Sequence, residues 1–469
     1  MTTTEPSVFD QRRLSDIYDE IRQVYQSDTR PWIIGYSGGK DSTAALQLVW
    51  SALAELPLEK RIKPVYVIAS DTLVETPVIV DYIDTTLSKV SETARTMQMP
   101  FSAAKVQPQV SETFWVNLIG RGYPAPQQQF RWCTDRMKIR PADRFIREKV
   151  SQHGEVVVVL GVRRSESMTR AQVMSLHEIK GSILSRHTRF SGAFVYTPIR
   201  DFSLDDVWSY LLQTPCPWGN NNRDLVALYR TANSGECPLV VDDTTPSCGN
   251  SRFGCWVCTV VSQDKTMEAL IDSGEEWMEP LLEVRNFLAS TQDPEVKPKY
   301  REYKRRTGLV SFNTKNGKMV PGPYKLEFCR EVLRKLLHAQ LQVRKSGPDP
   351  AAELIGREEL FEIRRIWRTE RGDWQDSVPE IYKDVVGNDL LWTRDDIGPF
   401  GDSELALLEK VCHEKNIQPM LLVKLISAEL SSQGMSRRSS VYSKIERILG
   451  EEWRTAEEIL AQLPTPPRN

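Results

Sequence analysis

In the first 265 residues, short runs of apolar residues alternate with longer stretches in which apolar residues recur at helical spacing. The short runs predict buried strands at 32–36, 65–70, 156–161 and 194–198, with a further strand around 103–106. The longer stretches predict helices at 43–56, 77–97, 141–152 and 204–213. Strands that alternate with helices are typical of a mostly parallel sheet covered on both faces, so the predicted fold class is α/β.

From residue 324 onward the pattern is helical. The main predicted helices cover 326–343, 351–371 and 402–430, with a linker at 346–350 and a small helical end-piece at 440–463. We therefore expect five segments along the chain. They are an N-terminal helical lead (1–29), an α/β domain (30–233), a cysteine-rich segment (234–265), a basic helical and turn region (266–345) and a helical C-terminal region (346–469).

A glycine turn joins the first predicted strand directly to the first predicted helix. Its sequence is SGGKDS, made of Ser37, Gly38, Gly39, Lys40, Asp41 and Ser42. Two adjacent glycines let backbone N–H groups approach an anion, the helix N-terminus adds partial positive charge, and the lysine adds a full one. The spacing does not fit G-x-x-x-x-G-K-[ST], which disfavours motor or kinase chemistry. The turn therefore predicts a phosphate cradle.

SGGKDS resembles the PP-loop of the ATP pyrophosphatases, a family that holds the β/γ-diphosphate and breaks ATP to AMP and pyrophosphate. The resemblance implies that residues 37–42 bind ATP, and that Lys40 and Asp41 take part in catalysis. Cleavage between the α and β phosphates usually adenylates a poor leaving group. The central question is then which acceptor is activated, and what attacks it.

Charged residues follow two other predicted strands, at the sheet edge where α/β folds bind ligands. Asp71 follows the second strand, and GVRRSESMTR (161–170) begins at Gly161 after the third. Arg163, Arg164 and Arg170 offer planar, permanently charged donors to a triphosphate, whereas Asp71 could accept from a ribose or help to hold Mg²⁺. The alternative is that these charges only pair with one another on the surface. Their shared placement favours a nucleotide site, in which Arg163 and Arg170 would be catalytic and Asp71, Gly161 and Arg164 would bind ATP.

Five motifs occur in the order seen in the phosphoadenylylsulfate reductase family. They are SGGKDS, the Asp71-Thr72 strand end, RWC (131–133) leading into KIRP (138–141), GVRRSES (161–167), and YTPIRD (196–201) before DVW (206–208). The resemblance covers about residues 30–215 and implies the adenine nucleotide α-hydrolase fold. The reductases carry a catalytic cysteine near their C-terminus, whereas no cysteine follows Cys412 in this sequence. Sulfonucleotide reduction is therefore the second expectation.

Four of the eight cysteines fall within twenty-two residues, at Cys237, Cys248, Cys255 and Cys258. Such a quartet in a cytoplasmic protein indicates metal binding rather than disulfides. Four thiolates fit either a tetrahedral Zn²⁺ or a [4Fe–4S] cluster, and the spacing alone does not separate the two. The iron–sulfur centres of some relatives, and an apolar shell from Phe253 and Trp256, favour the cluster.

Cys133 is a separate candidate for sulfur chemistry. Its basic neighbours, among them Arg131, Arg136 and Lys138, should favour the thiolate and so a nucleophilic or persulfide role. A buried, inert thiol is the competing interpretation. The adjacent cysteine pair of the cluster-bearing reductases is absent, because Trp132 precedes Cys133.

The cysteine block at 235–260 resembles that of the DndC-type DNA phosphorothioation proteins, and with the other motifs the resemblance runs through at least residues 30–330. It implies an ATP pyrophosphatase and sulfurtransferase that adenylates a backbone phosphate oxygen of DNA, which sulfur then replaces. The implied partners are DNA, a cysteine desulfurase as sulfur donor, and other phosphorothioation subunits.

Residues 297–306 concentrate six basic side chains and two tyrosines. Such a stretch could grip a DNA backbone, which makes Lys304, Arg305 and Arg306 candidates for DNA contact. A solvated helix face is an equal alternative. The net charge of the whole chain is only −2, so any contact with nucleic acid must be local.

Composition narrows the remaining possibilities. The N-terminus has no signal-peptide pattern and no apolar run approaches membrane-spanning length, so we expect a cytoplasmic protein without a membrane partner. Besides phosphorothioation and sulfonucleotide reduction, a tRNA-thiolating PP-loop enzyme remains open. A fourth possibility is a non-catalytic, nucleotide-sensing regulatory protein that holds only structural zinc.

Overall fold

The computed structural model describes residues 7–166, 168–232, 254–314, 317–392, 402–430 and 439–461. Its contacts divide the chain into two compact units. Unit 1 combines Met1–Gln109 with Gln128–Leu282, and unit 2 combines Val110–Gln127 with Glu283–Asn469. The division departs from the segments expected from the sequence, because 110–127 lies inside the predicted α/β domain yet packs within unit 2. Two indole hydrogen bonds hold the segment 110–127 in unit 2. The Trp115 N–H donates to the Leu354 carbonyl at 2.7 Å, and the Trp367 N–H donates to the Ile119 carbonyl at 2.9 Å.

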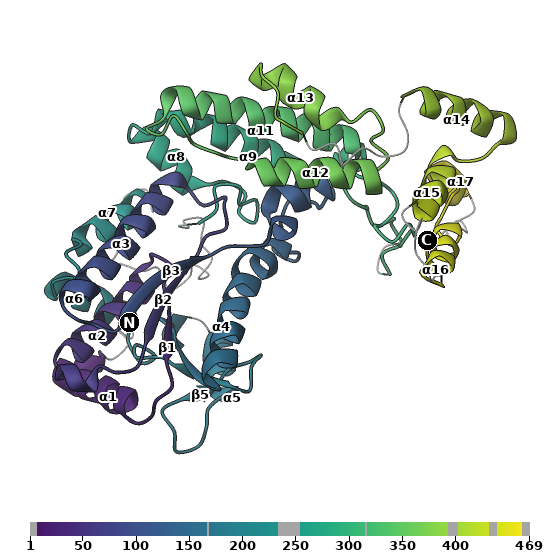
Figure 1. Ribbon diagram of the computed structural model, residues 1–469. Helices are drawn as coiled ribbons and strands as arrows, with labels where there is room; N and C mark the ends of the chain where they lie inside the picture. Colours follow the sequence, from purple (N-terminus) through teal and green to yellow (C-terminus); the bar gives the residue numbers. More distant parts are fainter. Residues whose placement is uncertain are drawn as a thin grey trace, which may run out of the picture. The chain divides into compact units, whose positions relative to one another are not determined.

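Unit 1 is built on a six-stranded sheet with the order β3-β2-β1-β4-β6-β5. Figure 1 labels the neighbouring strands β3, β2 and β1. The strands are β1 (Trp32–Gly35), β2 (Val65–Ser70), β3 (Phe101–Val106), β4 (Val156–Val159), β5 (Ser185–Arg186) and β6 (Ala193–Tyr196). All neighbouring pairs are parallel except β5 with β6. The five predicted strands and the α/β fold class are confirmed. The two-residue β5 was not predicted, because so short a strand leaves no periodic signal.

Helices cover both faces of this sheet. They are α1 (Leu14–Gln26), α2 (Lys40–Ala54), α3 (Pro77–Thr96), α4 (Arg140–His153), α5 (Met168–Leu176), α6 (Leu204–Gln213), α7 (Asn222–Ala232) and α8 (Lys265–Asp272). Strand alternation divides the core between the two faces. Trp32 and Ile34 pack in the larger cluster with residues of α1, α2, α3 and α6, whereas Ile33 packs in the smaller one with Ile146 of α4.

The strand order fixes where a ligand can bind. The chain runs from β1 outward to β2 and β3, and then returns to place β4 on the other side of β1. In open α/β sheets the crevice at such a reversal, beyond the carboxyl ends of the strands, is the usual ligand site. The PP-loop follows β1, and the Gly161 segment follows β4, so the two flank this position.

Unit 2 is helical. Beyond α9 (Glu279–Ser290), which begins in unit 1, it contains α10 (Lys297–Tyr300), α11 (Leu326–Ser346), α12 (Arg357–Glu370), α13 (Ser377–Val386), α14 (Asp402–Lys415), α15 (Pro419–Leu430), α16 (Ser439–Leu449) and α17 (Ala456–Ala461). Its core forms where buried side chains of α11 and α12 meet the buried segment 114–119.

Three features of unit 2 differ from the prediction. The single helix expected at 402–430 is two helices, because Asn416 adopts a left-handed conformation (φ 53°) and Pro419 then opens α15. The helix expected from 351 begins at Arg357, where the Glu359 carboxylate accepts the Gly356 N–H at 2.9 Å. Helix α13 was not predicted. None of the helices in the described ranges is both long and apolar enough to cross a membrane.

Candidate nucleotide and thiol site

The PP-loop forms the tight turn between β1 and α2 that its sequence predicts. Gly38 adopts φ +73°, a conformation that glycine reaches without strain, and Gly39 caps α2. Hydroxyl groups hold the loop from within: Ser42 Oγ donates to the Gly39 carbonyl at 2.9 Å and accepts the Ser37 N–H at 3.2 Å. The loop thus presents the first turn of a fifteen-residue helix, where the backbone N–H groups favour an anion.

Three charged side chains form a chain across this turn. Lys40 Nζ lies 3.0 Å from Asp41 Oδ2, and Arg163 Nε lies 2.7 Å from Asp41 Oδ1. The Arg163 side chain is 7% exposed, and its guanidinium also donates to Ser165 Oγ at 3.0 Å. Two cations are therefore held beside the helix N-terminus by a single carboxylate, which leaves positive charge available to a phosphate group.

Gly161 explains how the segment after β4 reaches this turn. A Cβ atom at Gly161 would lie 2.4 Å from the Asp41 carbonyl oxygen and 2.7 Å from the Ser42 nitrogen. Only a residue without a side chain allows the two backbones to approach so closely. Gly161, which the sequence predicts to bind ATP, is also the packing position that brings Arg163 to Asp41.

Tyr229 of α7 completes the turn, and sequence reasoning did not identify it. Its hydroxyl accepts the Lys40 backbone N–H at 3.2 Å, and its ring lies 5.3 Å from Lys40 Nζ. Burial raises the pKa of this tyrosine, so the hydroxyl stays neutral. No motif marks Tyr229, since it lies about 190 residues from the loop in sequence.

Two of the predicted ATP contacts lie apart from this chain of charges. Arg164 is 40% exposed and pairs with Glu178 and with Asp201, the latter at 3.2 Å. Asp71 is buried and engaged: Oδ1 accepts the Leu73 N–H at 2.9 Å, while Oδ2 accepts from Gln107 at 2.9 Å and lies 3.3 Å from Lys105. The side chain of Arg170 lies outside the described residues, although its backbone belongs to α5.

Cys255 packs against the loop that follows β2, the strand next to β1. The residue forms an antiparallel bridge with Glu75, and the Trp256 N–H donates to the Val74 carbonyl at 3.0 Å. Cys255 Sγ lies 3.3 Å from Thr72 Oγ1 and 3.8 Å from Glu75 Oε1. The part of the cysteine segment that the structure describes is therefore anchored at the carboxyl edge of the sheet.

Three thiols share this environment. Burial, and then the charge of Cys258, raise the pKa of Cys133. Burial, and then the charge of Glu75, raise the pKa of Cys255, and Cys133 adds to that rise. The charge of Cys255 in turn raises the pKa of Lys138, which lies 3.3 Å from Glu75 Oε1. The charges of the last two members of the predicted quartet thus interact with Cys133, an interaction that the sequence analysis missed.

The ionisation expected for Cys133 is not what the structure gives. Basic neighbours were expected to favour the thiolate, but burial outweighs them, and Lys138 is the predicted basic neighbour that lowers its pKa. Cys237 and Cys248 lie outside the described residues. Within the ranges that are described, no group of three or more Cys, His, Asp or Glu side chains is arranged to hold a metal ion.

The DNA-contact candidates belong to unit 2. Lys304 is half-buried, whereas Arg305 and Arg306 are exposed. They follow the one-turn helix α10 rather than forming a long basic helix face, and Arg301 makes an antiparallel bridge with Tyr324 just before them.

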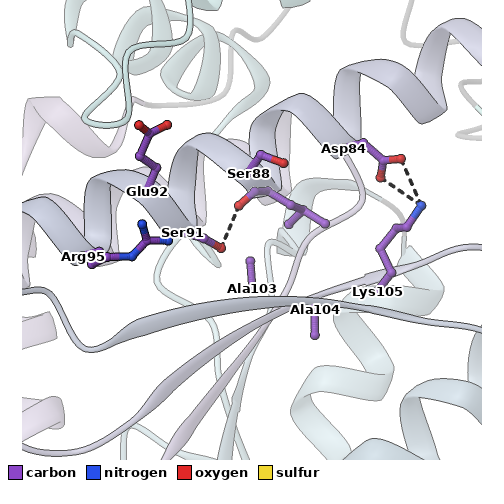
Figure 2. Close-up of a pocket in the computed structure, with 9 residues that line it drawn as sticks. Asp84, Ser88, Ser91, Glu92, Arg95, Ala103, Ala104 and Lys105 are labelled. Carbon is purple, nitrogen blue, oxygen red and sulfur yellow. Dashed lines mark hydrogen bonds and ion pairs between the residues drawn. The ribbon is translucent and has the colours of Figure 1, made fainter.

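A groove of about 640 Å³ lies between α3 and the edge strand β3 (Figure 2). Its lining is Asp84, Leu87, Ser88, Ser91, Glu92, Arg95, Ala103, Ala104 and Lys105. Figure 2 shows Lys105 reaching Asp84, with Nζ to oxygen at 3.0 Å. The groove contains no PP-loop residue and no cysteine. The candidate nucleotide site is instead the turn after β1, which this groove does not include.

Comparison with known families agrees with this geometry. Residues 31–261 match the family model described as the phosphoadenosine phosphosulfate reductase domain. An uncharacterized protein of Methanocaldococcus jannaschii is 28% identical over 238 residues, which is 51% of this chain and 38% of that protein. The chain thus spans less than two-fifths of the length of that relative.

Solved structures with similarity to this chain are much more distant. The phosphoadenylyl-sulfate reductase of Candida auris has 16% identity and a TM-score of 0.28, over 46% of this chain and 90% of the reductase. The U34-tRNA thiolase NcsA of Methanococcus maripaludis, solved with its [4Fe–4S] cluster, has 11% identity and a TM-score of 0.28, over 63% of this chain and 87% of the thiolase.

Proposed function

Because residues 31–261 match the phosphoadenosine phosphosulfate reductase domain, we propose that this chain is a PP-loop ATP pyrophosphatase and sulfurtransferase that acts on DNA. It would adenylate a backbone phosphate oxygen, which sulfur then replaces. One observation carries the proposal: the anion cradle follows β1, and Cys255 lies beside the end of the neighbouring strand β2. The charge of Cys255 acts on Lys138, and the charge of Cys258 acts on Cys133. Phosphate activation and sulfur chemistry then share one edge of one sheet.

The first step is adenylation. A non-bridging oxygen of a DNA phosphate attacks the α-phosphorus of ATP, a new P–O bond forms, the bond to the β-phosphate breaks, and pyrophosphate leaves. The Gly39–Lys40 turn and the α2 N-terminus would hold the β/γ-diphosphate, and Lys40 with Arg163 would stabilise the charge on the leaving group. Asp41 positions both cations.

The second step replaces oxygen by sulfur. A sulfur nucleophile at the hydrosulfide level attacks the adenylated phosphorus, a P–S bond forms, the P–O bond to the adenylate breaks, and AMP leaves. The sulfur starts as the outer sulfur of the persulfide of a cysteine desulfurase, and it passes to Cys133 when the Cys133 thiolate attacks it and the desulfurase thiolate leaves. A dithiol then reduces the Cys133 persulfide, so that the dithiol becomes a disulfide and hydrosulfide is released. We assign Cys133 to receive that sulfur, because its side chain is only partly buried and because the charges of Cys255 and Cys258 act on it.

The proposed cofactors are ATP, Mg²⁺ and a [4Fe–4S] cluster, with Zn²⁺ as the alternative to the cluster. Asp41 and Asp71, the acidic residues of the nucleotide region, are both engaged with cations or amides, so the proposal assigns Mg²⁺ no protein ligand. Cys255 and Cys258 are the described residues that fit a cluster ligand pair, and Cys237 and Cys248 would complete it. A bound cluster would supply a site for sulfur or electron transfer.

Sulfonucleotide reduction is the second candidate, since the matched family model carries that name. It needs the same nucleotide cradle but cleaves a sulfur–oxygen bond and releases sulfite, without forming pyrophosphate. The resemblance of the 235–260 cysteine block to phosphorothioation proteins is what places DNA sulfuration first.

The test supplies ATP, Mg²⁺, cysteine, a cysteine desulfurase, a dithiol and DNA, then digests the DNA with nucleases and detects phosphorothioate dinucleotides by mass spectrometry. We expect the product with wild type and with Cys216→Ser, and none with Lys40→Ala. Cys133→Ala should lose sulfuration yet still release pyrophosphate. Sulfite release from a sulfonucleotide, with no phosphorothioate, would replace this function by reduction.

A further inference from the structure

We propose that a basic pocket in unit 2, here called the Lys304 pocket, binds a phosphate of a nucleic acid backbone. It has a volume of about 300 Å³ and includes Lys304, Arg305, Lys424, Glu451 and Trp453 in its lining. This inference rests on the proposed function for its choice of ligand, because it deepens the assignment of DNA as acceptor. It also gives a role to the C-terminal helices, which carry no recognisable motif.

Charge is the first observation that points to an anion. The lining contains six basic side chains and three acidic ones. The whole chain, by contrast, has a net charge of −2, so positive charge is concentrated here against the background of the protein. A local excess of lysine and arginine is the electrostatic footprint of a phosphate-binding surface.

Two lysines at the pocket converge on one indole. Lys304 Nζ lies 4.7 Å from the Trp453 ring centroid, and Lys424 Nζ lies 5.4 Å from it. Glu451 pairs with Lys424 at 2.5 Å, whereas Lys304 has no ion pair in the described part of the chain. Burial, and then the charge of Lys424, lower the pKa of Lys304. The carboxylates of Glu451, Glu452 and Glu302 each raise this pKa by less. A phosphate between the two ammonium groups would further offset their repulsion.

Two arginines add positive charge to the same lining. Arg305 is exposed and makes no ion pair within the described ranges. Its neighbour Arg306 lies over the Tyr123 ring at 4.8 Å. A free phosphate would need only the two lysines, whereas a strand bearing successive phosphates would reach Arg305 as well. This arrangement favours the polymer over the small ion.

Segments distant in sequence build the pocket. Lys304 and Arg305 follow α10, Lys424 belongs to α15, and Trp453 follows α16. A hydrogen bond from the Tyr303 hydroxyl to the Arg454 carbonyl, at 2.8 Å, joins the basic stretch to the C-terminal segment. Because the pocket depends on both the basic stretch and the C-terminal segment, loss of either should weaken phosphate binding.

The test is fluorescence anisotropy of a labelled oligonucleotide, single-stranded and as duplex, with the full chain over a range of KCl concentrations. For Lys304→Ala and Arg305→Ala we expect weaker binding and a salt slope reduced in magnitude by about one for each charge removed. The control is Lys383→Ala, an exposed lysine of α13 outside the pocket, which should bind like wild type.

Wild-type affinity and slope in both variants would overturn the proposal. Inorganic phosphate that stabilises wild type but not Lys304→Ala against heat, with unchanged oligonucleotide binding, would also overturn it in favour of a small-anion site. Circular dichroism checks folding, and if Lys304→Ala does not fold, the exposed Arg305→Ala carries the test. Pyrophosphate release from ATP is measured separately, so failure of the proposed function and failure of this pocket give different results.

Discussion

The Tyr229 hydroxyl accepts the backbone N–H of Lys40 at 3.2 Å, at the first turn of the helix that follows the PP-loop. A Cβ at Gly39 would lie 3.2 Å from the same hydroxyl oxygen, so the tyrosine fills the space directly above the glycine turn. In this structure an oxygen atom therefore already occupies a donor that a phosphate would use. Tyr229 and the diphosphate would compete for the Lys40 N–H.

Tyr229→Phe removes the competing oxygen while it keeps the ring beside Lys40. Since one hydrogen bond contributes about 0.5–1.5 kcal/mol, we expect the apparent Kd for ATP to fall by about two- to tenfold. Isothermal titration with a non-hydrolysable ATP analogue measures this. A rise in Kd of similar size would show that the hydroxyl contacts the nucleotide instead of competing with it.

The pair of Asp41 and Arg163 supports a prediction about stability. Arg163 is 7% exposed, so Asp41→Asn leaves a nearly buried guanidinium without its carboxylate. Removing one partner of a buried pair costs about 3–5 kcal/mol, and because the Asp41 side chain retains 19% exposure we expect about 3 kcal/mol in urea unfolding. The double variant Asp41→Asn/Arg163→Gln should recover part of the loss. A double variant that loses the full sum of both single effects would show that the pair is not coupled.

Gly161→Ala tests the backbone approach between the β4 and β1 segments. The added methyl group would meet the Asp41 carbonyl at 2.4 Å, and backbone atoms cannot rotate away as side chains do. We expect a destabilisation of about 1–3 kcal/mol together with weaker ATP binding, because the α2 N-terminus must shift. Gly181→Ala is the comparison: its φ of +75° also makes alanine costly, yet no atom lies within 4 Å, so ATP binding should be unchanged. Equal ATP binding in both variants would contradict a role for the Gly161 contact.

The cysteine segment supports a prediction about metal content. Anaerobic purification followed by iron, sulfide and zinc quantitation should find iron and sulfide at about four each per chain, and Cys255→Ser should lose both. Cys412→Ser, on α14, should retain them. One zinc without sulfide would assign the quartet a structural role and leave Cys133 as the sulfur carrier.

The sequence predicted the parallel sheet well because strands and helices there have distinct periodicities, as in the buried Val156–Val159 run and the amphipathic α4. It also placed Lys40, Asp41 and Arg163 near one another, since a parallel sheet brings strand ends to one edge. These inferences needed only local pattern and a topological rule.

Contacts that depend on tertiary packing could not be predicted from the sequence. Nothing local marks Tyr229 as a neighbour of Lys40, and nothing in the spacing of the cysteine quartet shows that Cys133 joins Cys255 and Cys258. Asp71 and Arg164 follow strands as predicted, but each found other partners, in Lys105 and Gln107 for the first and in Asp201 and Glu178 for the second. Side-chain pairing is decided by distances that the sequence pattern does not contain.

The most direct test of the central claim is the product of ATP cleavage. Wild-type protein is incubated with Mg²⁺, DNA, cysteine, a cysteine desulfurase and a dithiol. One sample receives ATP labelled at the α-phosphate and a second receives ATP labelled at the γ-phosphate, and the products of both are separated by thin-layer chromatography. We predict AMP with an equal amount of pyrophosphate, a rate at least about 100-fold lower for Lys40→Ala, and no change for Lys180→Ala, an exposed lysine of the same unit. ADP with inorganic phosphate, no turnover at all, or undiminished AMP formation by Lys40→Ala would contradict this prediction.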